Sequence, residues 1–352
     1  MKVAIWGSYN HGNFGDDVMA VLFSEVLAAK GAQPIAFRLD SAISSRYRIR
    51  TVNSLDELFR GAAFAIIGGG MMLGEASAIR RVLRPYARSF ERDFFELRSA
   101  CRRSGLTVFP ISIGGDGEDD LSRLSRERLA FFKSSHCGPA TVRLPSDVKL
   151  LEVLGKQATY YPDVLLSIAN RWQLRREDGR DDRFHLGVNL NRRTGARLMR
   201  ALLELTLRHK RLVLHFIRSH LVDAAASYEI MPTAFGESVQ LHRYRDPKET
   251  AAFLGSLDAI VSSKLHLGVV ALSYGVPFLS FSGKGKTRAF MRSIGAEHAV
   301  FAVAQERSVV RTLEDMLVGR MSPKALIGSA SVAARESLGH LERLENLTTK
   351  GP

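Results

Sequence analysis

Short apolar segments alternate with longer amphipathic segments along most of this 352-residue chain, and this alternation constrains the fold more than any other feature. Strands that alternate with helical stretches are typical of parallel sheets joined by crossover helices. The expected fold class is therefore α/β. The segments interpreted as strands are Val3–Trp6, Gln33–Phe37, Phe64–Gly68, Thr107–Ile113, Ala158–Tyr161, Leu186–Leu190, Leu212–Ile217, Val239–His242, Ala259–Ser262 and Phe278–Ser282.

A charged stretch divides these strands into two groups. Residues 170–184 carry many Arg and Asp side chains, one glycine and little apolar content, so we interpret them as an exposed linker. The predicted organisation is an N-terminal Rossmann-like domain (1–170), a linker (171–184), a second Rossmann-like domain (185–320) and a C-terminal helical segment (321–352). Two doubly wound parallel-sheet domains are expected to face a cleft, with the ligand at the carboxyl ends of their strands.

The net charge of +14 favours acidic partners, which include nucleic acid, an anionic membrane and phosphorylated substrates. Only 8% of the residues are aromatic and no aromatic and basic recognition module is evident, so no nucleic-acid partner is expected. Cys101 and Cys137 have a spacing that fits neither a metal knuckle nor a redox pair, which indicates a reducing compartment. The chain enters a strand at once and has no apolar run of about 18 residues. We therefore expect a cytoplasmic protein.

The richest local pattern lies where an apolar strand meets a helix. Ser263 ends the strand, and Lys264 and His266 lie at the start of a helix that is predicted to run from Lys264 to Tyr274. Lys286 follows this helix. Amides at a helix start bind anions, and the two lysines would add positive charge. The pattern predicts a phosphorylated or carboxylated substrate. The simpler alternative is that His266 is only a half-buried polar residue in the first turn.

A glycine-containing loop follows the first strand. It carries His11, Asn13 and Asp16, and its glycines at 12 and 15 would let the backbone approach a ligand closely. The spacing matches neither the dinucleotide fingerprint nor the Walker loop. A helix is predicted from about residue 17 to residue 30. The alternative interpretation of Asp16 is therefore a cap for that helix.

These motifs together resemble the polysaccharide pyruvyl transferase family. Gly-Asn-Phe-Gly-Asp-Asp at residues 12–17 resembles a Gly-Asn-x-Gly-Asp-Glu motif, and residues 64–70 resemble a second glycine element that ends in Gly69 and Gly70. Residues 263–277 resemble an Arg-Leu-His signature, followed by a basic stretch at residues 286–288. Weaker matches occur at residues 161–163 and 186–190. The resemblance extends from residue 3 to about residue 295 and implies two Rossmann-like domains of the GT-B type.

The chain departs from the family pattern at two positions. Leu144 stands where an acidic residue is usual, although Arg143 before it is kept. Lys264 replaces the arginine of the signature, which preserves the charge but loses the planar fork of a guanidinium. Both departures affect how a phosphate or carboxylate would be positioned.

The resemblance implies transfer of the enolpyruvyl group of phosphoenolpyruvate to sugar hydroxyls, with release of phosphate and formation of a pyruvate ketal. His266 is the expected general acid that protonates the methylene carbon. No metal and no cofactor are required, because phosphoenolpyruvate is itself the donor substrate. The residues expected to bind this donor are Lys264, Lys286, Arg143, Arg218 and Ser263. The residues expected on the acceptor side are His11, Asn13, Gly15, Asp16, Gly69 and Gly70.

The expected acceptor is a glycan or a lipid-linked oligosaccharide in exopolysaccharide or cell-wall synthesis. A predicted amphipathic helix at residues 84–103 places arginines on one side and Phe90, Phe94, Leu97 and Cys101 on the other. We interpret the basic side as a solvated surface. The alternative is peripheral contact with the anionic inner membrane or with a lipid-linked diphosphate.

Two other functions remain open. One is a GT-B glycosyltransferase that uses a sugar nucleotide, which would need carboxylates for a ribose near the end of the second domain, where the chain offers mostly Lys and Arg. The other is a family member without activity that only binds anionic glycan. The replacements at Leu144 and Lys264 are the reason to consider it.

Overall fold

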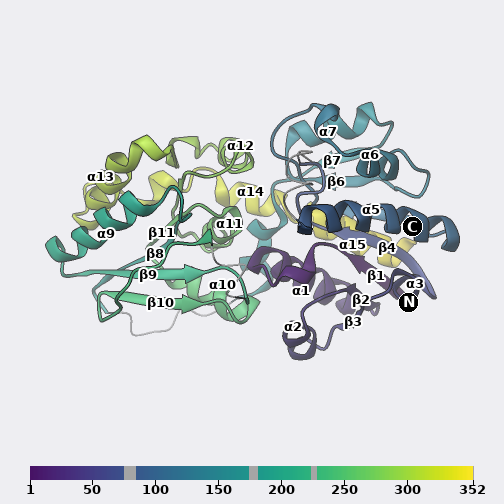
Figure 1. The fold of residues 1–352 in the computed structure, drawn as a ribbon, viewed down its shortest axis with the longest axis horizontal. Coiled ribbons are helices and arrows are strands. Elements are labelled where there is room, and N and C mark those ends of the chain that lie inside the picture. The colour runs from purple at the N-terminus through teal and green to yellow at the C-terminus, as the bar shows by residue number, and fades with distance from the viewer. Residues whose placement is uncertain (75–84, 174–180, 223–227, 352) are drawn as a thin grey trace. The chain divides into compact units, whose positions relative to one another are not determined.

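The computed structural model describes all residues except 75–84, 174–180, 223–227 and 352 (Figure 1). Residue contacts divide the chain into two compact units. Unit 1 consists of Met1–Asn10, Asp16–Val164 and Glu336–Pro352, and unit 2 consists of His11–Gly15 and Leu165–Arg335. Part of the N-terminal glycine loop therefore belongs to the unit that contains His266. The predicted domain bounds and the predicted cleft stay predictions.

Unit 1 contains a parallel sheet with the strand order β3-β2-β1-β4-β5. Its strands are β1 (Lys2–Trp6), β2 (Gln33–Phe37), β3 (Arg50–Val52), β4 (Ala62–Gly68) and β5 (Val108–Ile111). A two-stranded parallel sheet, β6 (Ala140–Val142) with β7 (Ala158–Tyr160), lies beside β5, where the Ile113 amide donates to the Thr141 carbonyl. The α-helices are α1 (Phe14–Ala29), α2 (Ser41–Arg46), α3 (Leu55–Phe59), α5 (Pro85–Ser104), α6 (Arg126–Phe132), α7 (Pro145–Val153) and α15 (Gly339–Lys350).

Unit 2 contains a parallel sheet with the order β10-β9-β8-β11-β12-β13. Its strands are β8 (Phe184–Asn189), β9 (Leu212–Arg218), β10 (Val239–Arg243), β11 (Ala259–Ser262), β12 (Phe278–Phe281) and β13 (Val300–Phe301). In Figure 1, α9 and α13 lie together on one face of this sheet, and α10 lies on the other face with α11. The α-helices are α8 (Ile168–Arg171), α9 (Ala196–Arg208), α10 (Pro247–Ser256), α11 (Leu265–Ser273), α12 (Gly285–Ser293), α13 (Glu306–Leu317) and α14 (Ala330–Glu336).

Short 3₁₀ turns complete both units. They are η1 (Tyr9–His11), η2 (Leu121–Arg123), η3 (Val164–Ser167), η5 (Glu297–Ala299), η6 (Val303–Gln305) and η7 (Pro323–Leu326). The strand order of both sheets reverses direction beside the first strand of each unit, β1 and β8. Ligands of doubly wound folds bind at such a switch point, beyond the carboxyl ends of the strands. The α/β prediction with two Rossmann-like sheets is confirmed.

Each predicted strand is present, and its bounds differ from the prediction by at most two residues. The prediction missed β3, β6 and β13, which are only 3, 3 and 2 residues long. So short a segment has too few residues to show an apolar pattern. The Asp246 cap predicted for α10 is confirmed, since its carboxylate accepts a 2.9 Å hydrogen bond from the Glu249 amide.

The alternative interpretation of Asp16 as a helix cap was wrong. The helix after the first glycine loop begins at Phe14, so Asp16 lies within its first turn and is not its cap. Within the predicted linker, Asn170, Arg171 and Gln173 are exposed, whereas Trp172 is 4% exposed and its carbonyl accepts a hydrogen bond from the Tyr274 hydroxyl. Residues 174–180 of that linker lie outside the described residues.

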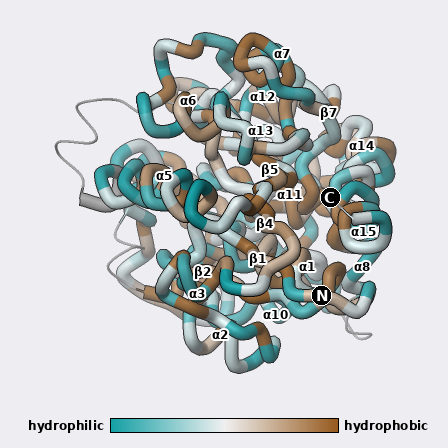
Figure 2. The backbone as a smooth tube through the Cα atoms, turned by 90° about the vertical axis from the view of Figure 1, so that its right-hand side faces the viewer, coloured by the Kyte–Doolittle hydropathy of each residue, from teal (hydrophilic) through white to brown (hydrophobic). Residues whose placement is uncertain are grey.

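The amphipathic helix predicted at residues 84–103 corresponds to α5, with Arg84 outside the described residues. Phe94, Leu97 and Cys101 are buried, and Phe94 packs edge-on against Trp6 with 5.0 Å between the ring centres. In Figure 2, hydrophilic (teal) and hydrophobic (brown) residues alternate along α5, as expected of an amphipathic helix. Arg103 pairs with the exposed Asp56. Membrane contact through α5 stays a prediction, and no helix in the described part of the chain is long and apolar enough to cross a bilayer.

Candidate functional site

The best-defined candidate site lies at the carboxyl ends of β11 and β12 in unit 2. Lys264 is the N-cap residue of α11, and its amide donates to the Ser262 hydroxyl at 2.9 Å. No side chain caps α11. His266 lies in the first turn of this helix and is half-buried. The sequence prediction placed both residues at a helix start, and the structure agrees.

Lys286 lies in the first turn of α12, which follows the neighbouring strand β12, and no side chain caps this helix either. Ser263 ties the two strand ends together. Its hydroxyl donates to the Phe281 carbonyl at 2.8 Å and accepts from the Asn191 amide at 3.2 Å. Two helix starts and two lysines thus lie at adjacent strand ends, which favours an anionic ligand. The predicted donor contacts of Lys264, Lys286 and Ser263 stay predictions.

The N-terminal glycine loop packs against this part of unit 2. The Phe14 amide donates to the Ser219 carbonyl at 3.0 Å, and the Leu221 amide donates to the Gly12 carbonyl at 2.8 Å. A methyl group built on Gly15 would lie 1.8 Å from Nδ1 of His266. Only glycine fits there unless the imidazole moves. Two motifs that are far apart in the sequence are therefore in contact.

The polar residues of this loop differ in exposure. His11 is exposed, whereas Asn13 and Asp16 are half-buried. Asn13 accepts a 3.1 Å hydrogen bond from the Gly15 amide at its Oδ1, which fixes the loop at the start of α1. Their roles at an acceptor stay predictions. Arg218 ends β9, is half-buried and precedes Ser219, so it lies at the same edge of the sheet, and its donor contact also stays a prediction.

A buried carboxylate at this edge was missed by the sequence analysis. Glu229 is 6% exposed and accepts hydrogen bonds from the Ser219 hydroxyl at 2.5 Å and from Asn189 Nδ2 at 3.0 Å. Burial by itself raises the pKa of Glu229, but contacts with His220, Ser219 and Asn189, together with the charge of Lys264, bring that pKa below its usual value. Glu229 therefore stays ionised beside the candidate site. No motif surrounds it in the sequence.

In unit 1, the second glycine element has packing reasons of its own. Gly68, Gly69 and Gly70 are buried, and a methyl group on Gly68 would lie 2.1 Å from the Tyr9 hydroxyl oxygen. Gly69 and Gly70 have φ values of 74° and 85°, which favour glycine. Open backbone for a substrate is therefore not needed to explain these glycines. The predicted acceptor contacts of Gly69 and Gly70 stay predictions.

Arg143 is held inside unit 1. It is 5% exposed, its Nη1 lies 2.8 Å from Asp163 Oδ2, and its Nη2 donates to the Gly70 carbonyl at 3.0 Å. This geometry favours a supporting role for Arg143, although its predicted donor contact is untested. Leu144, the departure from the family pattern, is buried at the start of α7.

Asp147 supplies a buried carboxylate near Arg143. Its Oδ1 accepts a 3.0 Å hydrogen bond from the Gly115 amide. Burial raises the pKa of Asp147 to about 7, although the Gly115 amide and the Arg143 charge favour the ionised form. This carboxyl group therefore changes charge near neutral pH.

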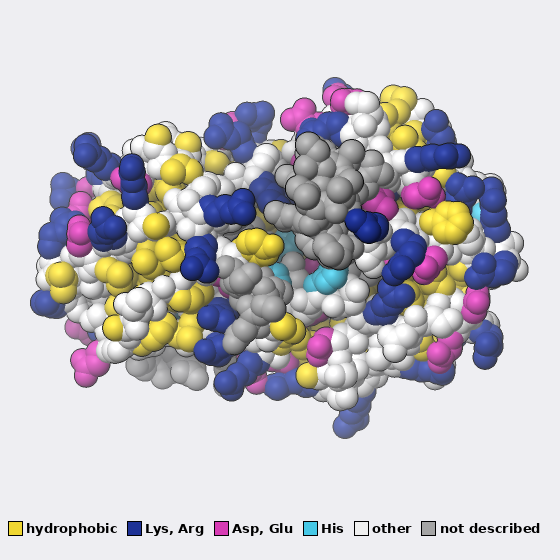
Figure 3. Space-filling view, in the orientation of Figure 1, with side chains coloured by type: hydrophobic (Ala, Val, Ile, Leu, Met, Phe, Trp, Pro, Cys, Tyr) yellow, Lys and Arg dark blue, Asp and Glu magenta, His cyan; other side chains and the backbone are white. Residues whose placement is uncertain are grey.

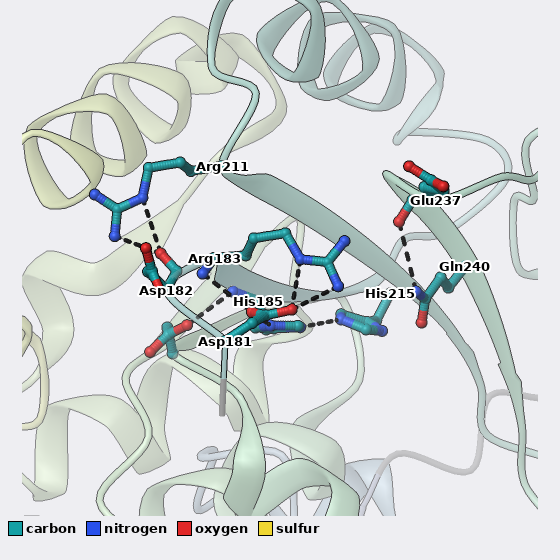
Figure 4. A network of polar contacts seen from close by, with 9 residues as sticks. Asp181, Asp182, Arg183, His185, Arg211, His215, Glu237 and Gln240 are labelled. Carbon is teal, nitrogen blue, oxygen red and sulfur yellow. Dashed lines mark hydrogen bonds and ion pairs between the residues drawn. The ribbon is translucent and has the colours of Figure 1, made fainter. Parts of the chain in front are cut away.

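Three histidines on neighbouring strands form a row across the sheet of unit 2, and Figure 4 shows two of them, His185 and His215. His185 on β8 contacts His215 on β9 at 2.8 Å, and His215 contacts His242 on β10 at 3.0 Å. Asp181 binds the other side of His185, and Phe253 of α10 stacks on His242. These contacts within the sheet account for the buried position of His215.

Charge alone does not locate the site. On the face shown in Figure 3, Lys and Arg side chains are spread widely, with Asp and Glu between them. Among the described residues, no group of three or more His, Cys, Asp or Glu side chains is placed to hold a metal ion.

Solved structures with a similar fold include proteins crystallised with UDP or UDP-glucose. The Staphylococcus aureus MnaA–UDP structure has a TM-score of 0.66 at 11% identity, over 98% of this chain and 95% of that one. A putative UDP-N-acetylglucosamine 2-epimerase from Listeria monocytogenes has a TM-score of 0.66 at 10% identity, over 100% and 98% of the two chains. Anabaena HepE in complex with UDP-glucose has a TM-score of 0.57 at 7% identity, over 99% and 100%. At these identities the likeness concerns the fold, which is GT-B-like.

Sequence comparison identifies the family. No curated protein sequence matches the chain significantly. The family profile described as polysaccharide pyruvyl transferase matches residues 13–285, which include residues 13–17 of the first glycine loop, the strand–helix junction at His266 and the first residue of α12. The chain therefore belongs to the polysaccharide pyruvyl transferase family.

Proposed function

We propose that this protein transfers the pyruvyl group of phosphoenolpyruvate to the hydroxyls of a glycan or a lipid-linked saccharide, forming a pyruvate ketal. The contact between Gly15 and His266 carries the proposal, because it joins the two most specific motifs of the family in one unit. We also propose that the protein acts in the cytoplasm.

The charges at the strand ends suit this donor. Phosphoenolpyruvate carries roughly three negative charges near neutral pH, and fixed cations stabilise such a ligand. Lys264 and Lys286 extend from two neighbouring uncapped helix starts. The helix dipoles and the ammonium groups would bind the phosphate and the carboxylate together.

His266 would protonate the methylene carbon of the donor. An imidazole titrates near working pH, and a neighbouring anion favours its charged form. Protonation produces a cation-like carbon next to oxygen, which an acceptor hydroxyl attacks. Gly15 supports this role, because the absence of a side chain there leaves room for the His266 ring.

A sugar-nucleotide reaction is the second candidate, and the fold of the similar structures is the observation that favours it. The structures of MnaA and HepE were solved with UDP or UDP-glucose. A single assay separates the two functions. Phosphate release is followed with phosphoenolpyruvate and a panel of glycans and lipid-linked saccharides, and UDP release is followed with UDP-sugars on the same acceptors. Acceptor-dependent phosphate release supports the proposal, UDP release alone supports the second candidate, and neither release supports a glycan-binding protein.

A further inference from the structure

A second histidine, His220, lies on the segment that pairs with the loop that touches His266. The backbone of Asn13 pairs with that of His220 as an antiparallel bridge, and Gly15 packs on the imidazole of His266. His220 follows Ser219 just beyond the end of β9, and its side chain is 11% exposed. Both histidines are therefore next to the segment that carries the predicted acceptor contacts Asn13 and Gly15.

The contacts of Ser219 fix which ring nitrogen of His220 carries a hydrogen. A serine hydroxyl has one hydrogen, and Ser219 donates it to Glu229 Oε1 at 2.5 Å. The same Ser219 oxygen lies 3.2 Å from Nδ1 of His220, so Nδ1 must be the donor in that contact. Nδ1 is also 3.7 Å from Glu229 Oε1. Nε2 is left as the position where a proton can be gained or lost.

Nε2 of His220 makes no hydrogen bond within the described residues. Glu229 cannot move easily to change this arrangement, because residues 228–230 pair with the chain after β8. The Arg192 amide donates to the Tyr228 carbonyl at 2.7 Å, and the Ile230 amide donates to the Leu190 carbonyl at 2.9 Å. A buried anion, a serine and a histidine in this order resemble the arrangement by which enzymes orient a base.

On the basis of the proposed function, we infer that His220 accepts the proton of the attacking acceptor hydroxyl at Nε2, and that Ser219 and Glu229 are the positioning residues for this base. Lys264 is the other charged group that acts on Glu229. The reaction needs a base as well as an acid, since each hydroxyl that forms a C–O bond loses its proton. His266 and His220 would serve the donor and the acceptor respectively.

The steps balance. In the first, His266 forms the new C–H bond at the methylene carbon, a hydroxyl oxygen bonds to the adjacent carbon, and the hydroxyl proton moves to His220. In the second, the carbon–oxygen bond to phosphate breaks with its electron pair on phosphate, and the second hydroxyl attacks the same carbon. Of the two hydroxyl protons, one replaces the proton that His266 gave and the other leaves on phosphate.

The first test needs no substrate. Nitrogen-15 NMR of histidine-labelled full-length protein, assigned with His220→Gln, reports the tautomer of each ring. The inference expects a hydrogen on Nδ1 of neutral His220, with Nε2 as the nitrogen that titrates. A hydrogen on Nε2 in the neutral ring would overturn it, whatever reaction the protein catalyses.

The second test uses turnover and begins with the parent protein, whose phosphate release from phosphoenolpyruvate tests the proposed function separately. If that release is observed, His220→Gln should lower kcat by about 10²- to 10⁴-fold. Its affinity for phosphoenolpyruvate, measured by calorimetry, should change less than twofold. The control is His298→Gln, which alters an exposed histidine of unit 2 and should leave kcat unchanged.

The pH profile distinguishes a positioning role from a structural one. Glu229→Gln keeps the size of the side chain but removes the anion, so the imidazole releases its proton more easily and the acidic limb of kcat/KM for the acceptor moves to lower pH. In His220→Gln this limb should disappear. Loss of activity with the limb unchanged in both variants would mean that the two residues only support the fold, and the inference would be wrong.

Discussion

Gly15 lies against the imidazole of His266 so closely that any side chain at position 15 would overlap the ring. The glycine needs no unusual backbone conformation, because its φ is not in the left-handed region. It is therefore the space requirement of His266 that demands glycine here. This relationship connects the start of α1 to the start of α11.

Gly15→Ala should therefore displace His266 without strain in its own backbone. We expect kcat to fall by about 10²-fold, since a shift of about 1 Å in a reacting group has effects of that size. Phosphate release from phosphoenolpyruvate measures kcat, and thermal unfolding measures stability. Gly236→Ala is a matched control, because a methyl group there meets no atom within 4 Å. Unchanged kcat in Gly15→Ala would show that catalysis does not depend on the exact position of the His266 ring.

Removal of the two predicted donor-side groups should have different effects. His266→Ala should abolish transfer while phosphoenolpyruvate binding remains measurable, because an acid acts in the chemical step. Lys286→Ala should mainly weaken donor binding, since an ammonium at a helix start stabilises the bound anion. Calorimetry and phosphate release separate Kd from kcat. Lys324→Ala, at an exposed position in η7, is the control. Parent-like activity in both variants would contradict the assignment.

The fold could be predicted because the information is local. Adjacent residues alone identify the apolar strand Ala259–Ser262. They also identify the helix that starts after it, at Lys264 and His266. The same applies to the Asp246 cap of α10. Local patterns of this kind fix strands, helix starts and the cations attached to them.

The remaining parts of the site depend on contacts between distant segments. Glu229 becomes important only because Asn189 and Ser219 come from two different strand ends. The internal pairing of Arg143 depends on Asp163, which follows another strand. Met19, which is 50 residues away in the sequence, occupies the space beside Gly69. Sequence spacing carries no information about such contacts.

Removing only one partner of the ion pair between Arg143 and Asp163 should strongly lower the unfolding free energy. Asp163→Ala leaves a buried guanidinium without its carboxylate, and such changes cost about 3–5 kcal/mol. The double variant Arg143→Met/Asp163→Ala should lose less than the sum of the single losses, because no charge is left buried. Urea unfolding provides the measurement.

The control for this cycle is Asp56→Ala, which breaks the exposed pair with Arg103 and should cost at most about 1 kcal/mol. Donor affinity of the double variant, measured where it is folded, also tests the donor contact predicted for Arg143. A large loss of phosphoenolpyruvate affinity would establish that contact. Additive stability losses would show that the ion pair contributes nothing to the interior of unit 1.

Asp147 should make stability fall as pH rises through the weakly acidic range. Burial raises the pKa of this carboxyl group to about 7, so the folded protein keeps the proton after the unfolded chain, with its ordinary value near 3.8, has lost it. Between these two values the unfolded state binds fewer protons, and the slope of the unfolding free energy with pH is negative, about 1.4 kcal/mol per pH unit. Above pH 7 this slope ends.

Asp147→Asn removes the titrating group while it keeps an oxygen for the Gly115 amide. Relative to the parent, its unfolding free energy should therefore increase by about 2–3 kcal/mol between pH 5 and pH 8. Urea midpoints at both pH values measure the difference. The control is Asp56→Asn, which alters an exposed carboxylate. The difference in unfolding free energy between this variant and the parent should be about the same at pH 5 and at pH 8. An equal effect of Asp147→Asn at pH 5 and pH 8 would mean that this buried carboxyl group does not titrate there.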